Sequence, residues 1–296
     1  MTCDSDVYLI EHAATQFCDV SVVIPCYCCA ATLQRAVASV AAQTALPREV
    51  ILVDDDSNDG SKTSAAIERI RAAYSSIFEV RSYLQIPNQG PGTSRNLGWN
   101  LARSQFVAFL DADDTWDTRK LEIQTSWMIT HPSTVLTCHG CEDPRVSADV
   151  WGPRPSNQVR ARELWVRGLI WRNPVSTPTV MVRRICEERF VDGSRFGEDF
   201  DLWLRVIGSG GKCSMIEDCL ARLCKLSFGS YGQSGHLWAM ESGELRAIDG
   251  VLRRHQLRAV LVRFAQVFSL LKFLRRAVIA GLYRMRLRAR HKGRLQ

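Results

Sequence analysis

Two apolar runs of this sequence each end in a cluster of aspartates. Residues 50–53 read Val-Ile-Leu-Val and lead into three aspartates at 54–56, and residues 106–110 read Phe-Val-Ala-Phe-Leu and lead into Asp111 and Asp113. Open α/β sheets bind their ligands at the carboxyl ends of strands. Carboxylates that converge there repel one another unless a cation joins them, and a divalent metal carrying a substrate diphosphate is the usual cation. The two clusters therefore predict a metal-dependent enzyme that handles nucleotides.

Further apolar runs alternate with amphipathic segments along the chain. The pattern predicts strands at 20–24, 50–53, 80–84, 106–110 and 134–138, helices at 32–42, 61–74, 94–103, 119–130 and 200–209, and extended structure at 174–182. The helix at 61–74 is expected to be capped by its first serine. Strands that alternate with helices of about ten residues imply parallel βαβ units with right-handed crossovers. We therefore expect an α/β fold around a mainly parallel sheet.

Charge is distributed unevenly over the 296 residues, whose formal net charge is +7. Residues 250–296 hold 13 of the 38 Lys and Arg and no acidic residue, which leaves 25 basic against 31 acidic residues in the rest. Leu, Val and Phe recur at helical spacing among these charges, which favours an anionic membrane surface over nucleic acid as the partner of this tail. The alternative is that residues 257–271 pack on the preceding domain as an ordinary helix.

The ends of the chain and its cysteines carry no export or zinc signature. Residues 1–18 lack the basic and apolar regions of a signal peptide and are expected to form a loose leader. No uncharged apolar stretch reaches 18 residues, so no membrane span is predicted. The 11 cysteines lack zinc-site spacing and are expected to be buried, reduced thiols. We expect a cytoplasmic chain, attached peripherally to the inner face of the membrane through its tail.

Five segments, in this order, carry a family resemblance: residues 20–27, 53–57, 90–98, 110–114 and 197–205. Together they resemble the family 2 glycosyltransferases, which are inverting enzymes of the GT-A fold that use nucleotide-diphosphate sugars. The resemblance covers roughly residues 19–236, and it is closer to the non-processive members because the Gln-x-x-Arg-Trp signature of processive synthases is absent. It implies one GT-A domain over 19–249, with a donor half at 19–140 and an acceptor half at 141–249.

The resemblance also implies roles in donor binding for four residues. Pro25 and Tyr27 would contact the nucleobase, and Asp55 would accept the imide N–H of uracil or its equivalent. Arg95, which follows a Gly-rich turn, would point into the donor site near the nucleotide. Alternatives that stay open are an ordinary tyrosine at the edge of the core, a solvated Asp-rich turn and a surface arginine. A calcium loop is rejected, because no frame through the Asp-rich turn supplies the glutamate at its twelfth position.

The remaining site residues are implied for the metal and the chemistry. Asp113 would bind Mn²⁺ or Mg²⁺. Asp111 would contact either the ribose or a ligand of the metal. Asp199 would be the general base that deprotonates the acceptor hydroxyl, with Glu198 beside it shaping the site. His236 would meet the diphosphate or the metal. Acidic residues are also common in the first turn of a helix, and His236 also fits a surface loop.

The predicted function is the transfer of one sugar, with inversion, from a nucleotide-diphosphate sugar to the hydroxyl of a glycan or lipid-linked acceptor, in surface polysaccharide or lipid-linked glycan assembly. One alternative is a nucleotidyltransferase, although residues 20–30 lack the Gly-rich, basic phosphate loop that such an enzyme is expected to carry. The other is a catalytically inactive, membrane-tethered module that binds sugar nucleotides. No nucleic acid partner is expected.

Overall fold

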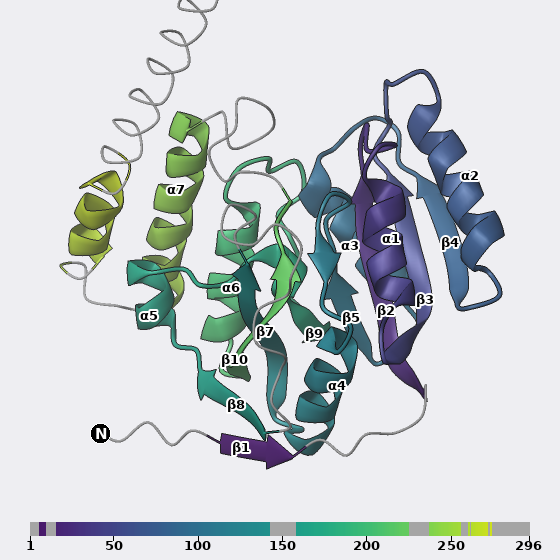
Figure 1. The fold of residues 1–296 in the computed structure, drawn as a ribbon. Helices are drawn as coiled ribbons and strands as arrows, with labels where there is room; N and C mark the ends of the chain where they lie inside the picture. The colour runs from purple at the N-terminus through teal and green to yellow at the C-terminus, as the bar shows by residue number, and fades with distance from the viewer. Residues whose placement is uncertain are drawn as a thin grey trace, which may run out of the picture.

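The described strands form one ten-stranded sheet. The structure is a computed structural model of the chain, and it describes residues 6–9, 16–142, 158–224, 237–255, 260, 262–271 and 273. The strands are β1 (Asp6–Leu9), β2 (Gln16–Cys26), β3 (Ala45–Asp54), β4 (Glu79–Leu84), β5 (Phe106–Phe109), β6 (Thr115–Trp116), β7 (Thr134–Glu142), β8 (Gln158–Glu163), β9 (Met181–Arg183) and β10 (Lys212–Arg222). They lie in the order β4-β3-β2-β5-β9-β7-β10-β8-β1, with β6 paired to β10 (Figure 1).

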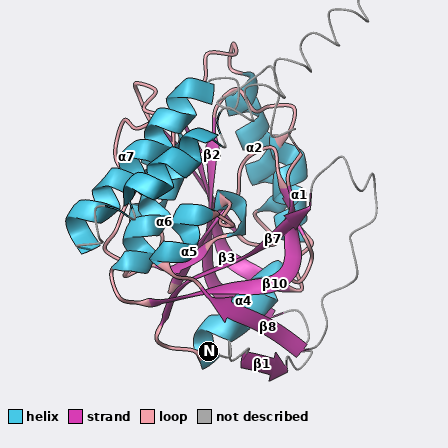
Figure 2. Cartoon of the chain, turned by 90° about the vertical axis from the view of Figure 1, so that its left-hand side faces the viewer, coloured by secondary structure: helices cyan, strands magenta, loops and turns pink. Residues whose placement is uncertain are grey.

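Helices cover both faces of this sheet. They are α1 (Leu33–Ala41), α2 (Lys62–Tyr74), α3 (Pro91–Leu101), α4 (Lys120–Thr130), α5 (Val166–Trp171), α6 (Glu198–Gly208) and α7 (Leu237–His255), with a 3-10 turn, η1 (Thr177–Thr179). Helices α1, α2 and α4 pack on one face, and α3, α5, α6 and α7 on the other. Figure 2 shows α5, α6 and α7 together on one side of the strands. None of the described helices has the length and apolar character that crossing a bilayer requires.

The two helical layers exist because successive side chains of a strand point to opposite faces. In β2, Val22 and Ile24 pack against the α1 layer, while Val23 packs against the α3 layer. Strand β2 pairs in parallel with both β3 and β5. Their carboxyl ends therefore lie at the same edge of the sheet, and the two aspartate clusters meet there as the sequence predicts.

The five predicted strands and five predicted helices all occur, and the differences lie mainly at their ends. Helix α3 begins at Pro91 rather than at residue 94, which fits the preference of proline for the first helical turn. The serine cap predicted for α2 is wrong. Ser61 makes no side-chain capping bond, and the Asp59 carboxylate accepts the Thr63 N–H instead.

The sheet is mixed rather than mainly parallel. Strands β4, β3, β2 and β5 run parallel, as predicted, but β9 is antiparallel to both β5 and β7, and β8 is antiparallel to β10. Strand β1 pairs antiparallel with β8 and β2 begins at Gln16, so two parts of the expected leader at 1–18 are strands. The predicted tail boundary at residue 250 falls inside α7. The ten described cysteines are free thiols, as expected, but Cys28 and Cys219 are exposed rather than buried.

Gly98 sets how closely α3 approaches the sheet. A Cβ added at this position would lie 2.4 Å from Cγ1 of Val23, which is fully buried in β2. We expect Gly98→Ala to lower the free energy of unfolding by about 1–3 kcal/mol, because the buried strand has no room to move away. Denaturant unfolding measures this. Gly168→Ala is the matched control, since its Cβ would meet open space, and equal losses in both variants would contradict the argument.

Candidate active site

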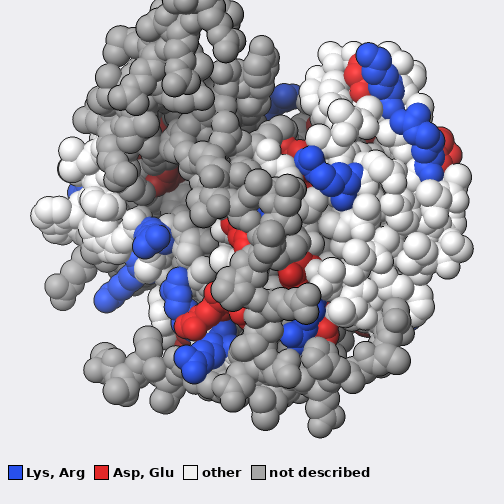
Figure 3. Space-filling model, in the orientation of Figure 1, with Lys and Arg blue, Asp and Glu red and all other residues white. Residues whose placement is uncertain are grey.

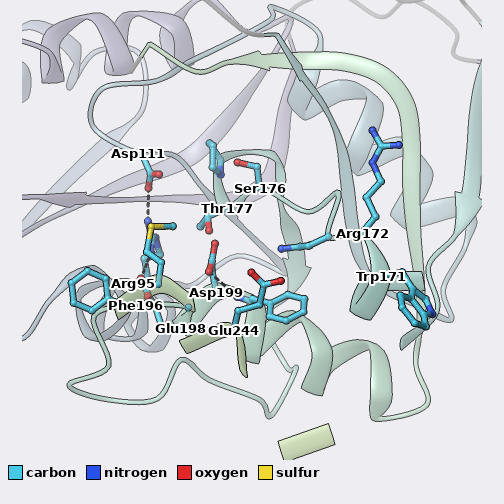
Figure 4. A pocket seen from close by; sticks show the side chains of 15 residues that line it. Arg95, Asp111, Trp171, Arg172, Ser176, Thr177, Phe196, Glu198, Asp199 and Glu244 are labelled. Carbon is cyan, nitrogen blue, oxygen red and sulfur yellow. Dashed lines mark hydrogen bonds and ion pairs between the residues drawn. The ribbon is translucent and has the colours of Figure 1, made fainter. Parts of the chain in front are cut away.

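A cavity of about 490 Å³ opens where α3, α6, α7 and the segment between α5 and η1 come together. Four of its lining residues are site residues expected from the sequence: Arg95, Asp111, Glu198 and Asp199. Figure 4 shows these side chains together with the others that line the cavity, which include Trp171, Arg172, Asn173, Ser176, Thr177, Phe196, Met240 and Glu244. The expected residues therefore share one pocket although they come from distant parts of the chain.

A buried arginine lies at the centre of this pocket. Arg95 is 5% exposed, and its Nη2 donates a hydrogen bond to Oδ1 of Asp111 (Figure 4). Its Nη1 lies 3.9 Å from Oε1 of Glu198, and its guanidinium lies 5.5 Å from the centre of the Phe190 ring. Its Nε is buried and has no hydrogen-bond partner among the described residues. One cation thus neutralises carboxylates from two different elements.

The two acidic residues at the start of α6 have raised pKa values. Gly197 precedes them with φ 73°, a left-handed conformation that glycine adopts without strain. Burial, reinforced by the nearby charge of Asp199, raises the pKa of Glu198 to about 7, although Arg95 opposes the shift. Burial also raises the pKa of Asp199, whose Oδ1 accepts the Phe200 N–H at 2.7 Å. A carboxylate with a raised pKa is suited to accepting a proton from a substrate.

Exposure distinguishes the two carboxylates. Glu198 is 5% exposed, and its Cγ lies 3.2 Å from the position that a Cβ on Gly92 would take, so it packs beneath the first turn of α3. Asp199 lines the cavity and is partly exposed. Both line the cavity, and Asp199 is the more accessible of the two to a bound molecule.

Other expected site residues lie outside this cavity. Pro25 and Tyr27 lie at the end of β2, where the Tyr27 hydroxyl donates a hydrogen bond to Asn58 Oδ1 at 3.3 Å and its ring is half exposed. Asp113 is partly exposed just beyond Asp111. The structure places the three at the carboxyl edge of the sheet, and their contacts with a donor stay predictions. His236 lies outside the described residues.

Asp55 holds the Gly-rich turn that precedes α3. Its Oδ1 accepts hydrogen bonds from Gln85 Nε2 at 2.6 Å and from the Gln89 N–H at 2.9 Å, and its Oδ2 accepts the Gly90 N–H at 2.7 Å. Its backbone carbonyl accepts a further bond from Asn88 Nδ2 at 2.7 Å. Both oxygens of this buried carboxylate are thus engaged by the protein. Its expected contact with a base stays a prediction beside this structural role.

The residues near Asp111 and Asp113 can be tested as a metal site. Within the described residues, no three His, Cys, Asp or Glu side chains converge closely enough to hold a metal ion by themselves. Magnesium often takes only one or two protein carboxylates and completes its shell with substrate phosphates and water. Asp111 accepts a hydrogen bond from Arg95, and Asp113 beside it has a partly exposed carboxylate of the hard oxygen type that such ions prefer. This donor set fits a metal that arrives with a diphosphate.

The sequence reasoning missed the part of the cavity wall that α7 supplies. Met240 and Glu244 of this helix line the pocket. Helix α7 reaches the site because a Cβ on Gly243 would lie 2.2 Å from the Phe196 carbonyl oxygen, and one on Gly197 would lie 2.9 Å from the Gly243 carbonyl carbon. Two glycines therefore allow α7 to touch the loop before Asp199. The Gly243-Glu244 pair in an otherwise helical pattern was the available signal.

Comparisons with known proteins identify the family of the chain. The profile of glycosyl transferase family 2 matches residues 21–195. An uncharacterized glycosyltransferase of Nostoc sp. is 32% identical over 178 residues, which is 58% of this chain and 53% of that protein. The UDP-Glc:alpha-D-GlcNAc-diphosphoundecaprenol beta-1,3-glucosyltransferase WfgD of Escherichia coli is 32% identical over 188 residues, 64% of this chain and 69% of that protein. The chain spans about half the length of the Nostoc protein and 30% of two Rickettsia glycosyltransferases.

Solved structures share the fold. TarS of S. aureus, residues 1–349 in complex with UDP-GlcNAc, superposes with a TM-score of 0.63 at 19% identity, covering 87% of this chain and 72% of that one. The mannosyltransferase PcManGT of Pyrobaculum calidifontis, in complex with GDP-Man and Mn²⁺, also gives 0.63, at 16% identity, covering 98% and 83%. The predicted GT-A-like α/β fold is confirmed, and because the family profile matches more than half of the sequence, the chain belongs to glycosyl transferase family 2.

Proposed function

We propose that this protein transfers one sugar from a nucleotide-diphosphate sugar to an acceptor hydroxyl, with inversion at the anomeric carbon and with the help of a divalent metal. The observation that carries the proposal is the cavity in which Arg95 and Asp111 of the donor side meet Glu198 and Asp199 of α6. A buried cation and a partly exposed carboxylate with a raised pKa are the groups that such a displacement needs.

In the proposed reaction, Asp199 takes the proton of the acceptor hydroxyl. The acceptor oxygen then bonds to the anomeric carbon as the bond from that carbon to the phosphate oxygen breaks, and the nucleoside diphosphate leaves with the electron pair. One in-line displacement inverts the anomeric configuration. Burial beside Glu198 supports this role, because a carboxylate with a raised pKa is a stronger base toward a hydroxyl.

Asp113 would hold Mn²⁺ or Mg²⁺ against the donor diphosphate, and a bound metal there would neutralise the charge that develops on the leaving group. Arg95 keeps Asp111 oriented at the strand end through the hydrogen bond from its Nη2. Pro25, Tyr27 and Asp55 lie along the adjacent strand ends, where the nucleoside would lie. The Mn²⁺ in the PcManGT complex supports the metal part of this proposal.

The acceptor is proposed to be a glycan hydroxyl, carried on a lipid. The E. coli relative WfgD is named for such an acceptor, a sugar linked to diphosphoundecaprenol. Another relative, at 29% identity over 264 residues, is the succinoglycan biosynthesis protein ExoO of Rhizobium meliloti. Both names support a role in the assembly of surface polysaccharide or lipid-linked glycan.

Donor binding tests the metal assignment directly. In a thermal-shift screen of UDP- and GDP-sugars with Mn²⁺, the correct donor should stabilise the folded wild type. The free energy of unfolding should rise by about 2.7 kcal/mol when the donor is at 100 times its dissociation constant. We expect Asp113→Ala to lose the Mn²⁺-dependent part of this stabilisation while staying folded. Glu187→Ala, at an exposed residue distant in sequence, is the control. Unchanged Mn²⁺-dependent binding by Asp113→Ala would remove Asp113 from the metal site.

A further inference from the structure

The last described helix of the chain has two apolar stripes on opposite sides. Residues 260 and 262–271 form this element, here called the C-terminal helix, which lies beyond α7 in Figure 1. Its inner stripe, Val262, Ala265 and Ser269, is buried, and the Ser269 hydroxyl donates a hydrogen bond to Glu241 of α7 at 2.8 Å. At 100° per residue this stripe covers one side of the helix.

The outer stripe is only partly covered by the described residues. Its five residues recur at helical spacing and are each 40–65% exposed: Val260, Phe264, Val267, Phe268 and Leu271. At 100° per residue, the centre of this set lies about 150° around the helix from the centre of the inner stripe, and Phe268 lies nearest to that stripe, at about 90°. A helix that only packs on its own domain needs one apolar face, with polar residues opposite. The outer stripe is therefore in excess of what the fold uses.

The outer stripe reaches the mouth of the active-site cavity. The ring of Phe268 packs edge-on against that of Trp171, with their centres 5.4 Å apart. Trp171, at the end of α5, is itself partly exposed and lines the cavity. Two more exposed tryptophans, Trp165 and Trp238, lie at the starts of α5 and α7. Tryptophan is the residue that favours the boundary between an apolar phase and water.

The charge of this end of the chain is complementary to an anionic surface. Residues 250–296 carry 13 Lys and Arg and no Asp or Glu. Arg263 lies beside the outer stripe, and Arg167 and Arg172 flank Trp171 on α5; all three are exposed. By contrast, the described acidic and basic side chains are interspersed over the face shown in Figure 3. Each basic residue near an anionic bilayer adds to the attraction, and an exposed apolar stripe adds insertion.

We propose that the outer stripe of the C-terminal helix, continued by Trp171, is a docking surface for an anionic lipid bilayer. Trp171 contacts Phe268 of the outer stripe and also lines the cavity. Docking would therefore place the cavity mouth at the lipid headgroups. This deepens the proposed function, on which it rests for the lipid-linked acceptor. The sequence analysis offered membrane binding and packing on the domain as alternatives for this part of the tail. In this proposal the inner stripe packs on the domain and the outer stripe faces the bilayer.

The test uses the full chain, because ending it at residue 250 would cut α7 and remove the buried Val262 and Ala265. Wild type should co-sediment with vesicles of phosphatidylglycerol and phosphatidylcholine, and less so at high salt or with phosphatidylcholine alone. The double variant Phe264→Asp, Leu271→Asp should partition at least about tenfold less, since two exposed apolar side chains that would insert into the bilayer become charges. Ile185→Asp, at a residue 79% exposed elsewhere, should bind like the wild type.

Two further measurements on the same three proteins separate the possible failures. Thermal unfolding should be unchanged in the variants, and the Mn²⁺-dependent shift with donor sugars should persist, because neither stripe residue lines the cavity. Failure of the wild type to bind vesicles, equal binding by the double variant, or a dimer in solution that only the double variant dissociates would each overturn the proposal. Vesicle binding without any donor binding would support the docking surface and reject the proposed function.

Discussion

Replacing Asp199 with asparagine lowers the turnover number by about 10²–10⁴-fold and leaves donor affinity nearly unchanged, if Asp199 is the general base. The amide has almost the same shape but cannot accept the proton. Asp199 touches the cavity rather than the strand ends where the nucleoside is expected, so donor binding should not depend on its charge. Steady-state rates and donor thermal shifts, measured on one preparation, give both quantities.

The neighbouring carboxylate provides the control. Glu198→Gln should cost less activity than Asp199→Asn, because Glu198 is packed beneath α3 and is the less exposed of the two carboxylates. Wild-type kcat should rise with pH toward the pKa of about 7 that burial and the charge of Asp199 give Glu198, since the pair must lose its proton to act as a base. A larger loss in Glu198→Gln than in Asp199→Asn would transfer the role of base to Glu198.

The donor side of this site could be predicted from the sequence because its determinants are local. A buried parallel strand is a short continuous apolar run, and the residue that follows it must lie at the carboxyl edge of the sheet. Asp55, Asp111 and Asp113 could be placed by that rule alone. Helix α3 and Arg95 followed in the same way from a Gly-rich turn that opens a helix.

The rest depends on contacts that no local pattern encodes. Nothing in the sequence indicated that Asp55 would use both carboxylate oxygens to hold the turn at 89–90. Nor did it indicate that Arg95 would contact both Asp111 and Glu198, the second of which lies 103 residues further along the chain. The place of α7 beside the cavity depends on core packing by Ala247, Ile248 and Val251 and on the close approach of Gly243 to Gly197. Strand β9, antiparallel to both neighbours, breaks the βαβ pattern that the alternation predicted.

Replacing Arg95 with methionine should lower the free energy of unfolding by about 3–5 kcal/mol, the cost of removing one partner from a buried charge pair. Methionine keeps most of the length and apolar contact of the side chain, including its place against Phe190, so the loss reports mainly the charge. Arg95→Lys should lose less. Arg71→Met, which breaks an exposed pair with Glu68, should change stability by no more than about 1 kcal/mol.

The pH dependence of this loss tests its cause. Arg95 opposes the rise in the pKa values of Glu198 and Asp199, so its removal should raise both further. A carboxyl group whose pKa is higher in the folded than in the unfolded state binds more protons when folded, and stability then falls as pH rises between the two values. The difference between wild type and Arg95→Met should therefore be largest above pH 7 and shrink toward pH 4.5, because Glu198, whose pKa in the folded state is about 7, becomes protonated over this range. A difference that stays constant over this range would mean that Arg95 stabilises the fold by packing alone, and that the carboxylates of the site are neutralised by another group.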